Sequence, residues 1–80
     1  MFEVRATRPY EDDFQEEDRI IEQAALPLER SFGGAGSCRD MSGDGRELGF
    51  YAKTFDEAVA AKQRIHDTAI SGLIVIVREK

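Results

Sequence analysis

The first residues of the chain alternate between hydrophobic and polar side chains. Phe2, Val4 and Ala6 are separated by charged or polar residues throughout the segment MFEVRATRP. A period of two residues is typical of a strand that buries one face, and proline is expected to close such a strand. We therefore predict a first strand that ends at Pro9.

The next segment changes to a helical period. Asp13 and Glu16 have the spacing of a capping box, with aspartate in place of serine or threonine, and so mark the start of a helix. Proline disfavours helical geometry in the residue before it, so Pro27 should end this helix at Leu26. The apolar residues that recur at helical spacing are Ile20, Ile21, Ala24, Ala25 and Leu28.

Two short strands joined by a tight turn are expected in the middle of the chain. After a connection at 28–34, residues 35–41 predict a second strand and residues 46–55 a third. The sequence SGDG at 42–45 has the Asp-Gly chemistry of a hairpin turn. One face of the third strand carries Leu48, Phe50 and Ala52, and the other carries Glu47, Gly49, Tyr51 and Lys53.

A second helix and a final strand complete the pattern. Thr54 and Glu57 have the spacing of another capping box. Serine and glycine at 71–72 interrupt the chain, and the sequence LIVIVREK at 73–80 predicts a fourth strand. The apolar stripe of the second helix consists of Phe55, Ala58, Ala61, Ile65 and Ala69.

The predicted order is therefore strand, helix, strand, strand, helix, strand. Two strand–helix–strand units around a central hairpin form the α+β ferredoxin-like sandwich. Right-handed crossovers place both helices on one face of a four-stranded antiparallel sheet with the strand order 4-1-3-2. A chain of 80 residues suffices for one such unit, so we expect a single domain over residues 1–80.

Composition and charge narrow the possible function classes. Sixteen acidic residues against eleven basic ones give a net charge of -5. This charge disfavours direct binding to nucleic acid or to an anionic membrane, and it favours a basic protein partner. The single cysteine cannot form an intramolecular disulfide, and the longest apolar stretch, at 73–77, is too short to span a bilayer. We therefore expect a cytoplasmic protein.

The glycine-rich middle of the chain is interpreted as a backbone bend and not as a cofactor site. A dinucleotide fingerprint would need a third glycine where Arg39 stands, and a helix where a strand is predicted. Cys38 and His66 could form a thiol dyad, but they belong to different elements. Asp13 and Glu17 lack a third metal ligand at a fixed spacing. We expect no catalytic, cofactor or metal site, and hence no enzyme.

The segment RELGFYAKTFDEAVAAK resembles the hairpin-to-helix region of RNA-recognition motifs. The match rests on Arg46, Gly49 and Phe50, and it departs from the family pattern at Glu47 and Lys53. The resemblance implies RNA bases stacked on outward aromatic residues. The alternation assigns Phe50 to the core face instead, and the net charge opposes RNA binding. An RNA-recognition-like domain is a third alternative, together with a thiol enzyme.

Two features remain beyond what the fold requires. Six carboxylates fall within eight positions near the first helix start, more than the helix dipole accounts for, and they form either a solvating surface or a surface for a basic partner. The final strand is apolar on both faces: either Leu73, Val75 and Val77 face the helices and Ile74 and Ile76 face outward, or the reverse. The outward apolar face should be covered by a second copy of the chain or by a protein partner. The residues that we expect to bind a partner are Glu11, Asp12, Asp13, Glu16, Glu17, Asp18, Tyr51, Ile74 and Ile76.

The leading hypothesis is a small, acidic, non-enzymatic protein-binding module. It would be an inhibitor or adaptor that engages a basic nucleic-acid-handling protein, by analogy with the compact acidic phage inhibitors of restriction or CRISPR effectors. The alternative is a small-molecule-sensing regulatory domain that forms a homodimer through its sheet. In that case residues 33–36 would line the ligand site.

Overall fold

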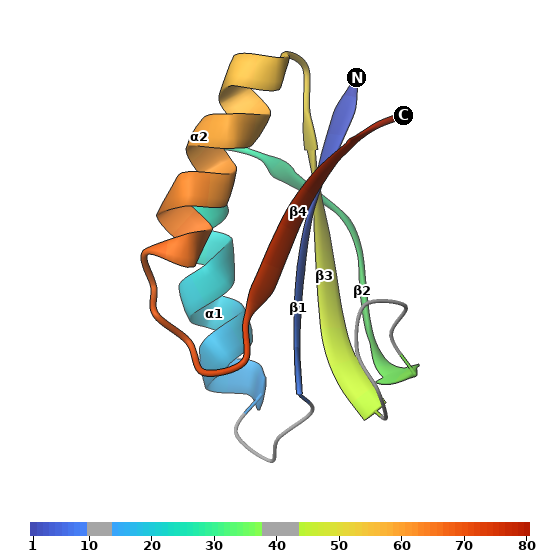
Figure 1. Cartoon of the computed structure of the whole chain (residues 1–80), viewed down its shortest axis with the longest axis vertical. Coiled ribbons are helices and arrows are strands. Elements are labelled where there is room, and N and C mark those ends of the chain that lie inside the picture. The colour runs from blue at the N-terminus through green and yellow to red at the C-terminus, as the bar shows by residue number, and fades with distance from the viewer. Residues whose placement is uncertain (10–13, 38–43) are drawn as a thin grey trace.

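The computed structural model describes residues 1–9, 14–37 and 44–80 of the chain. These residues form strands and helices in the predicted order (Figure 1). The elements are β1 (Phe2–Pro9), α1 (Phe14–Ala25), β2 (Glu29–Ser37), β3 (Asp44–Ala52), α2 (Phe55–His66) and β4 (Ile74–Glu79).

The strands form one antiparallel sheet with the order β2-β3-β1-β4, which confirms the predicted order. The central strand β1 pairs with β3 on one side and with β4 on the other. Both helices cover the same face of the sheet (Figure 1). We call the covered face the inner face and the opposite one the outer face. Within the described residues, no helix has the length and apolar composition needed to span a membrane.

The boundaries of β2 and β3 differ from the prediction. β2 begins at Glu29, inside the segment 28–34 that we expected to be a connection, and β3 ends at Ala52 instead of residue 55. Glycine has a low strand propensity, but pairing with β3 holds residues 33–36 in the ladder. Residues 38–43, which include the end of the predicted second strand and half of the predicted turn, lie outside the described residues.

The helix ends follow the predicted signals. α1 ends at Ala25, one residue before Leu26. Thr54 is the N-cap of α2, and its hydroxyl accepts a hydrogen bond from the backbone N–H of Glu57 at 3.2 Å. This contact confirms the predicted cap of α2. Asp13 lies outside the described residues, so the predicted cap of α1 remains a prediction.

The core fills the space between the inner face and the two helices. Removal of these side chains from water is the main contribution to the stability of the fold. The sheet contributes Val4, Ala6, Leu48, Phe50 and Ala52, α1 contributes Ile21 and Ala25, and α2 contributes Ala58, Ala61 and Ile65.

Three members of the predicted helical stripes neither belong to this core nor pack against it. Ile20 is 40% exposed, because the buried side of α1 is centred on Ile21. Phe55 is also exposed, and its ring meets Phe2 edge-on with 5.6 Å between the ring centres. Ala69 follows the end of α2 and has a positive φ of 57°. The predicted apolar stripes therefore included three residues that do not face the core.

The inward face of β4 is settled by its contacts. Leu73, Val75 and Val77 pack against the core as partly buried side chains. Because side chains alternate across a strand, Ile74 and Ile76 lie on the outer face. This is the first of the two arrangements that the sequence allowed.

Candidate interaction surface

β4 is an edge strand with one free side. β1 pairs with it on one side, and no strand of the described residues pairs with it on the other. The backbone N–H of Lys80 donates to the carbonyl of Met1 at 2.9 Å. Since hydrogen-bonded pairs alternate along antiparallel strands, Val75 and Val77 direct their backbone N–H and C=O groups away from β1. β4 therefore presents backbone donors and acceptors to a further strand.

At positions 74–77 the side chains of β4 are apolar on both faces. Ile74 is 39% exposed on the outer face, and Ile76 is half-buried beside it. Val75 and Val77 are half-buried on the inner face. An exposed edge strand of this composition is a template for pairing with another chain. We call the side chains of Ile74 and Ile76, together with the backbone groups of Val75 and Val77, the β4 edge.

Tyr51 does not extend the β4 edge. It is 42% exposed on the outer face, but it belongs to β3, on the far side of β1. The register places Tyr51 opposite Glu3, whereas Ile76 lies opposite Arg5. Charged side chains of β1 thus separate Tyr51 from the isoleucines. The structure brings Ile74 and Ile76 together and leaves Tyr51 apart.

A charged network occupies the centre of the outer face. Glu3 is only 2% exposed and accepts hydrogen bonds from Arg5 Nε at 2.8 Å and Ser31 Oγ at 2.9 Å. Arg5 also pairs with Glu47, and Lys80 Nζ lies 3.4 Å from the Glu3 carboxylate. Burial would raise the pKa of Glu3, but the hydrogen bonds from Arg5 and Ser31 and the nearby positive charges lower it overall. The positive and negative charges at the centre of the outer face therefore balance one another within the protein.

The six clustered carboxylates do not act as one surface in the described structure. Three of them lie outside the described residues: Glu11, Asp12 and Asp13. Glu16 is exposed, and its carboxylate lies 3.4 Å from the guanidinium of Arg19. Glu17 and Asp18 instead turn toward the sheet and bind arginines. Among the three described carboxylates, Glu16 is the one placed to meet a partner.

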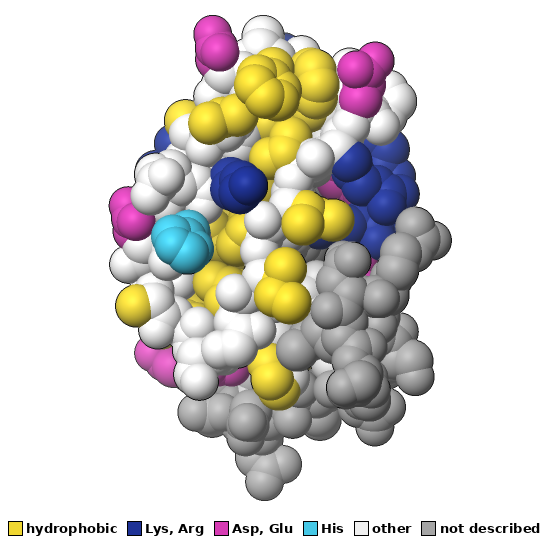
Figure 2. Space-filling model, in the orientation of Figure 1, with side chains coloured by type: hydrophobic (Ala, Val, Ile, Leu, Met, Phe, Trp, Pro, Cys, Tyr) yellow, Lys and Arg dark blue, Asp and Glu magenta, His cyan; other side chains and the backbone are white. Residues whose placement is uncertain are grey.

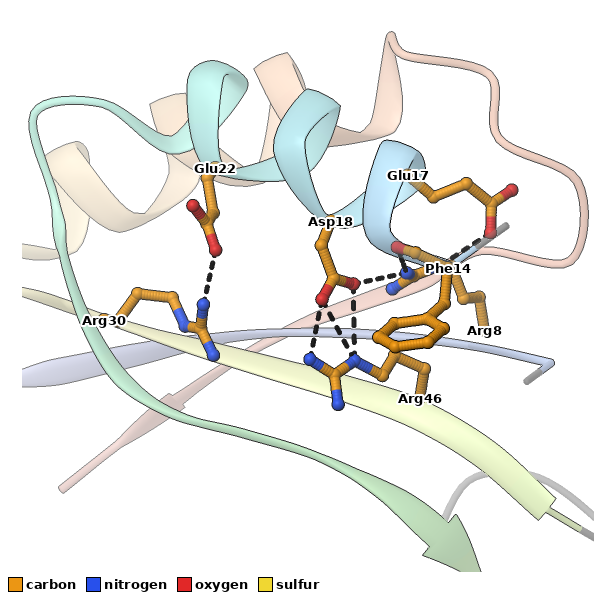
Figure 3. Close-up of polar contacts among 7 residues, drawn as sticks. All are labelled: Arg8, Phe14, Glu17, Asp18, Glu22, Arg30 and Arg46. Atoms are coloured by element: carbon orange, nitrogen blue, oxygen red, sulfur yellow. Dashed lines mark hydrogen bonds and ion pairs between the residues drawn. The ribbon is translucent and has the colours of Figure 1, made fainter. Parts of the chain in front are cut away.

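A buried ion cluster attaches α1 to the sheet (Figure 3). Arg8 of β1 is fully buried; its Nε donates to Glu17 at 2.9 Å, and its Nη2 donates to the Phe14 carbonyl at 2.9 Å and to Asp18. Arg46 of β3 donates to Asp18 from Nη2 at 2.6 Å, and its guanidinium lies 4.9 Å from the centre of the Phe14 ring. These contacts fix the first turns of α1 over β1 and β3.

Asp18 is the centre of this cluster. Burial would raise its pKa, but hydrogen bonds from Arg46 and Arg8 and their positive charges lower the pKa below its usual value. The ionised carboxylate balances the charge of Arg8, whose Nη1 has no hydrogen-bond partner among the described residues. Sequence reasoning missed Arg8, although it has the same parity along β1 as Val4 and Ala6.

The residues of the other hypotheses are dispersed. Phe50 is buried in the core, as the alternation predicted, so it offers no stacking surface for RNA. His66 is exposed at the end of α2, and Cys38 lies outside the described residues. Residues 33–36 belong to β2 and pair with residues 45–48 of β3.

Comparisons with protein-family models and with curated proteins find no match to this chain. The fold and the surfaces described above are therefore the basis for a functional proposal.

Proposed function

We propose that this chain is a ferredoxin-like, non-enzymatic protein-binding module that docks its partner along the β4 edge. The observation that carries the proposal is the free side of β4, where apolar side chains and outward backbone groups occur together. A partner strand added there would gain backbone hydrogen bonds from Val75 and Val77 and side-chain contacts from Ile74 and Ile76.

The lack of edge protection supports this use. Soluble proteins commonly block an edge strand with charged residues, proline or a bulge near its centre. In β4 the charged residues Arg78 and Glu79 stand at one end, while positions 74–77 are all apolar. The strand thus has a continuous apolar stretch that a partner can cover.

The net charge supports a basic partner. The chain carries a charge of -5, which attracts a basic surface and accelerates its association. Glu16 contributes to this attraction from the exposed side of α1. We therefore propose that the module acts in the cytoplasm as an inhibitor or adaptor of a basic nucleic-acid-handling protein, by covering a surface that otherwise receives phosphates.

The test of the β4 edge uses two isoleucines of nearly equal exposure. The immobilised chain is used to capture basic proteins at low salt from the native host, and the captured partner is then purified for binding measurements. Ile74→Thr should weaken affinity about tenfold, since an apolar contact of the β4 edge is lost while strand propensity is kept. Ile20→Thr, on α1, is the matched control and should leave affinity unchanged. Equal binding by both variants would overturn the assignment of β4.

The test of charge uses two first-turn carboxylates, Glu16 in α1 and Asp56 in α2. Glu16→Gln should reduce the association rate of the captured partner at low salt and have little effect at high salt, because screening removes the steering. Asp56→Asn should change the rate less. Failure to capture any basic protein at low salt would argue against the basic partner.

A further inference from the structure

The apolar run at the end of the chain is nearly symmetric about its centre. Residues 73–77 read Leu-Ile-Val-Ile-Val, with Val75 in the middle and an isoleucine on each side of it. A serine and a glycine precede the run at 71–72, and Arg78 and Glu79 follow it. Two antiparallel copies of this strand therefore match apolar positions with apolar positions.

The backbone of β4 permits such a match. β4 lies at one edge of the sheet (Figure 1), and Val75 and Val77 direct their backbone N–H and C=O groups away from β1. Val75 can exchange two hydrogen bonds with Val75 of a second, antiparallel copy. Val77 can donate to the carbonyl of Leu73 of that copy. The N–H of Leu73 already donates to the carbonyl of Ile70 at 3.2 Å, so the new ladder would end there.

One two-fold register pairs all five apolar positions with one another. When Val75 lies opposite Val75 of the second copy, Ile74 lies opposite Ile76 on the outer face, and Leu73 lies opposite Val77 on the inner face. Moving the centre by one residue in either direction places an arginine or a glycine opposite an isoleucine. Cross-strand pairs of apolar side chains stabilise a sheet, so the register centred on Val75 is the favoured one.

The other edge of the sheet, β2, is a poorer match for β4. It has glycine at 33, 34 and 36, and its ladder with β3 is irregular between Arg30 and Phe32. Glycine brings no side chain to pack against an isoleucine. The best complement to β4 within this chain is therefore β4 itself.

The size and charge of this contact predict a weak association. Five residues of an antiparallel strand span about 17 Å, so the contact should bury less than the roughly 1,600 Å² of a standard interface. Each copy also carries a charge of -5, and like charges repel at low salt. Positions 74–77 are themselves uncharged, so this repulsion acts from outside the ladder. Salt should therefore strengthen the dimer, whereas it should weaken the binding of a basic partner.

We propose that the free protein closes its β4 edge as a weak homodimer, in which two β4 strands pair about Val75. This inference rests on the proposed function in one respect: the protein partner uses the same edge and so binds only the monomer. Dimer formation then regulates the module, because partner binding weakens as the concentration of the chain rises. When half of the chains are dimeric, the apparent Kd for the partner should be about twice its intrinsic value.

The dimer is tested by sedimentation of the isolated chain from micromolar to near-millimolar concentration, at low and at high salt. The dimer fraction should rise with concentration and with salt. Val75→Pro should abolish the dimer, because it removes an outward N–H that the ladder with β1 does not use. Ile20→Thr, on α1, is the control and should dimerise like the original chain. A chain that stays monomeric at high salt would overturn the proposal.

Cysteine cross-linking tests the register in a chain that keeps its strand. The single native cysteine, Cys38, is first replaced by serine. Val75→Cys should then form a disulfide dimer, because the Cα atoms of a hydrogen-bonded pair lie about 5.5 Å apart. Ile76→Cys is the matched control: its equivalent in the second copy is a diagonal neighbour about 7–8 Å away, and it should not cross-link. Equal cross-linking of the two variants would contradict the register.

Competition with the captured basic partner tests the regulation. The cross-linked Val75→Cys dimer should not bind this partner, and reduction of the disulfide should restore binding. Unchanged binding by the cross-linked dimer would overturn both the regulation and the assignment of the partner to the β4 edge. Sedimentation and cross-linking need no partner, so failure to capture one would contradict the proposed function alone. A monomeric chain that still binds its partner along β4 would remove the dimer and leave the proposed function standing.

Discussion

Arg8 places a full positive charge at a position where the alternation of β1 would otherwise put an apolar side chain. A buried arginine is tolerated when carboxylates surround it, and here Glu17 and Asp18 meet it from α1. The signal for its burial is present in the sequence, since Arg8 continues the series of Val4 and Ala6. Its partners could not be inferred, because they depend on where the first turn of α1 lies over the sheet.

Loss of Asp18 should therefore be costly. Asp18→Asn is expected to lower the free energy of unfolding by about 3 kcal/mol, because it leaves the buried charge of Arg8 with weaker compensation. Urea unfolding at neutral pH measures this change. Glu16→Gln, two residues away but exposed, is the control and should change stability by less than about 0.5 kcal/mol. Equal stability of the two variants would mean that the cluster is not held by charge.

At the scale of the elements, regular side-chain patterns predicted most of the fold. The helical period and the prolines located α1, and the Thr54 cap located α2, because both signals act within one segment. The start of β2 could not be predicted, since residues 33–36 are held by backbone pairing with β3 and carry few side chains to show it. The alternation of side chains predicted that Ile74 and Ile76 share one face of β4. The separation of Tyr51 from these isoleucines could be found only from the strand register.

Two substitutions in the link between α2 and β4 are expected to change the stability of the fold in opposite directions. Ala69 has a positive φ of 57°, which strains any residue with a Cβ, so Ala69→Gly should stabilise the fold by about 1 kcal/mol. Gly72 has a φ of 73°, and a Cβ there would lie 2.7 Å from Pro9 Cδ. Gly72→Ala should therefore destabilise the fold. Thermal unfolding of both variants gives the two signs, and a stabilising Gly72→Ala would contradict this description of the link.

At the scale of the whole molecule, the charged side chains are unevenly distributed. Figure 2 shows the largest group of lysine and arginine side chains at one side of the described surface, the side on which the sheet lies in Figure 1. The carboxylates of Glu3 and Asp18 are taken up by internal pairs on opposite faces of the sheet. The function proposed here depends on the surface that these pairs leave available, the β4 edge.

The two internal carboxylates predict how stability depends on pH. Their pKa values are lowered in the folded state from reference values of 4.5 for Glu3 and 3.8 for Asp18. Ionisation therefore stabilises the fold fully above these reference values, and this contribution is lost as the pH falls through the lower folded-state values. The urea concentration at the midpoint of unfolding, measured from neutral pH to about pH 2, should fall as the pH is lowered. The fall should be shallower in Asp18→Asn, and a midpoint that stays constant would contradict the prediction.

The unequal edges of the sheet have a consequence for self-association. If β4 of one copy joined β2 of the next, every stack would still end in one free β4 and one free β2, so growth would continue into a fibre. Joining β4 to β4 would stop at two copies. A partner bound along β4 of every copy would leave no β4 free to join β2, and would therefore hold the chain in small complexes and prevent such fibres.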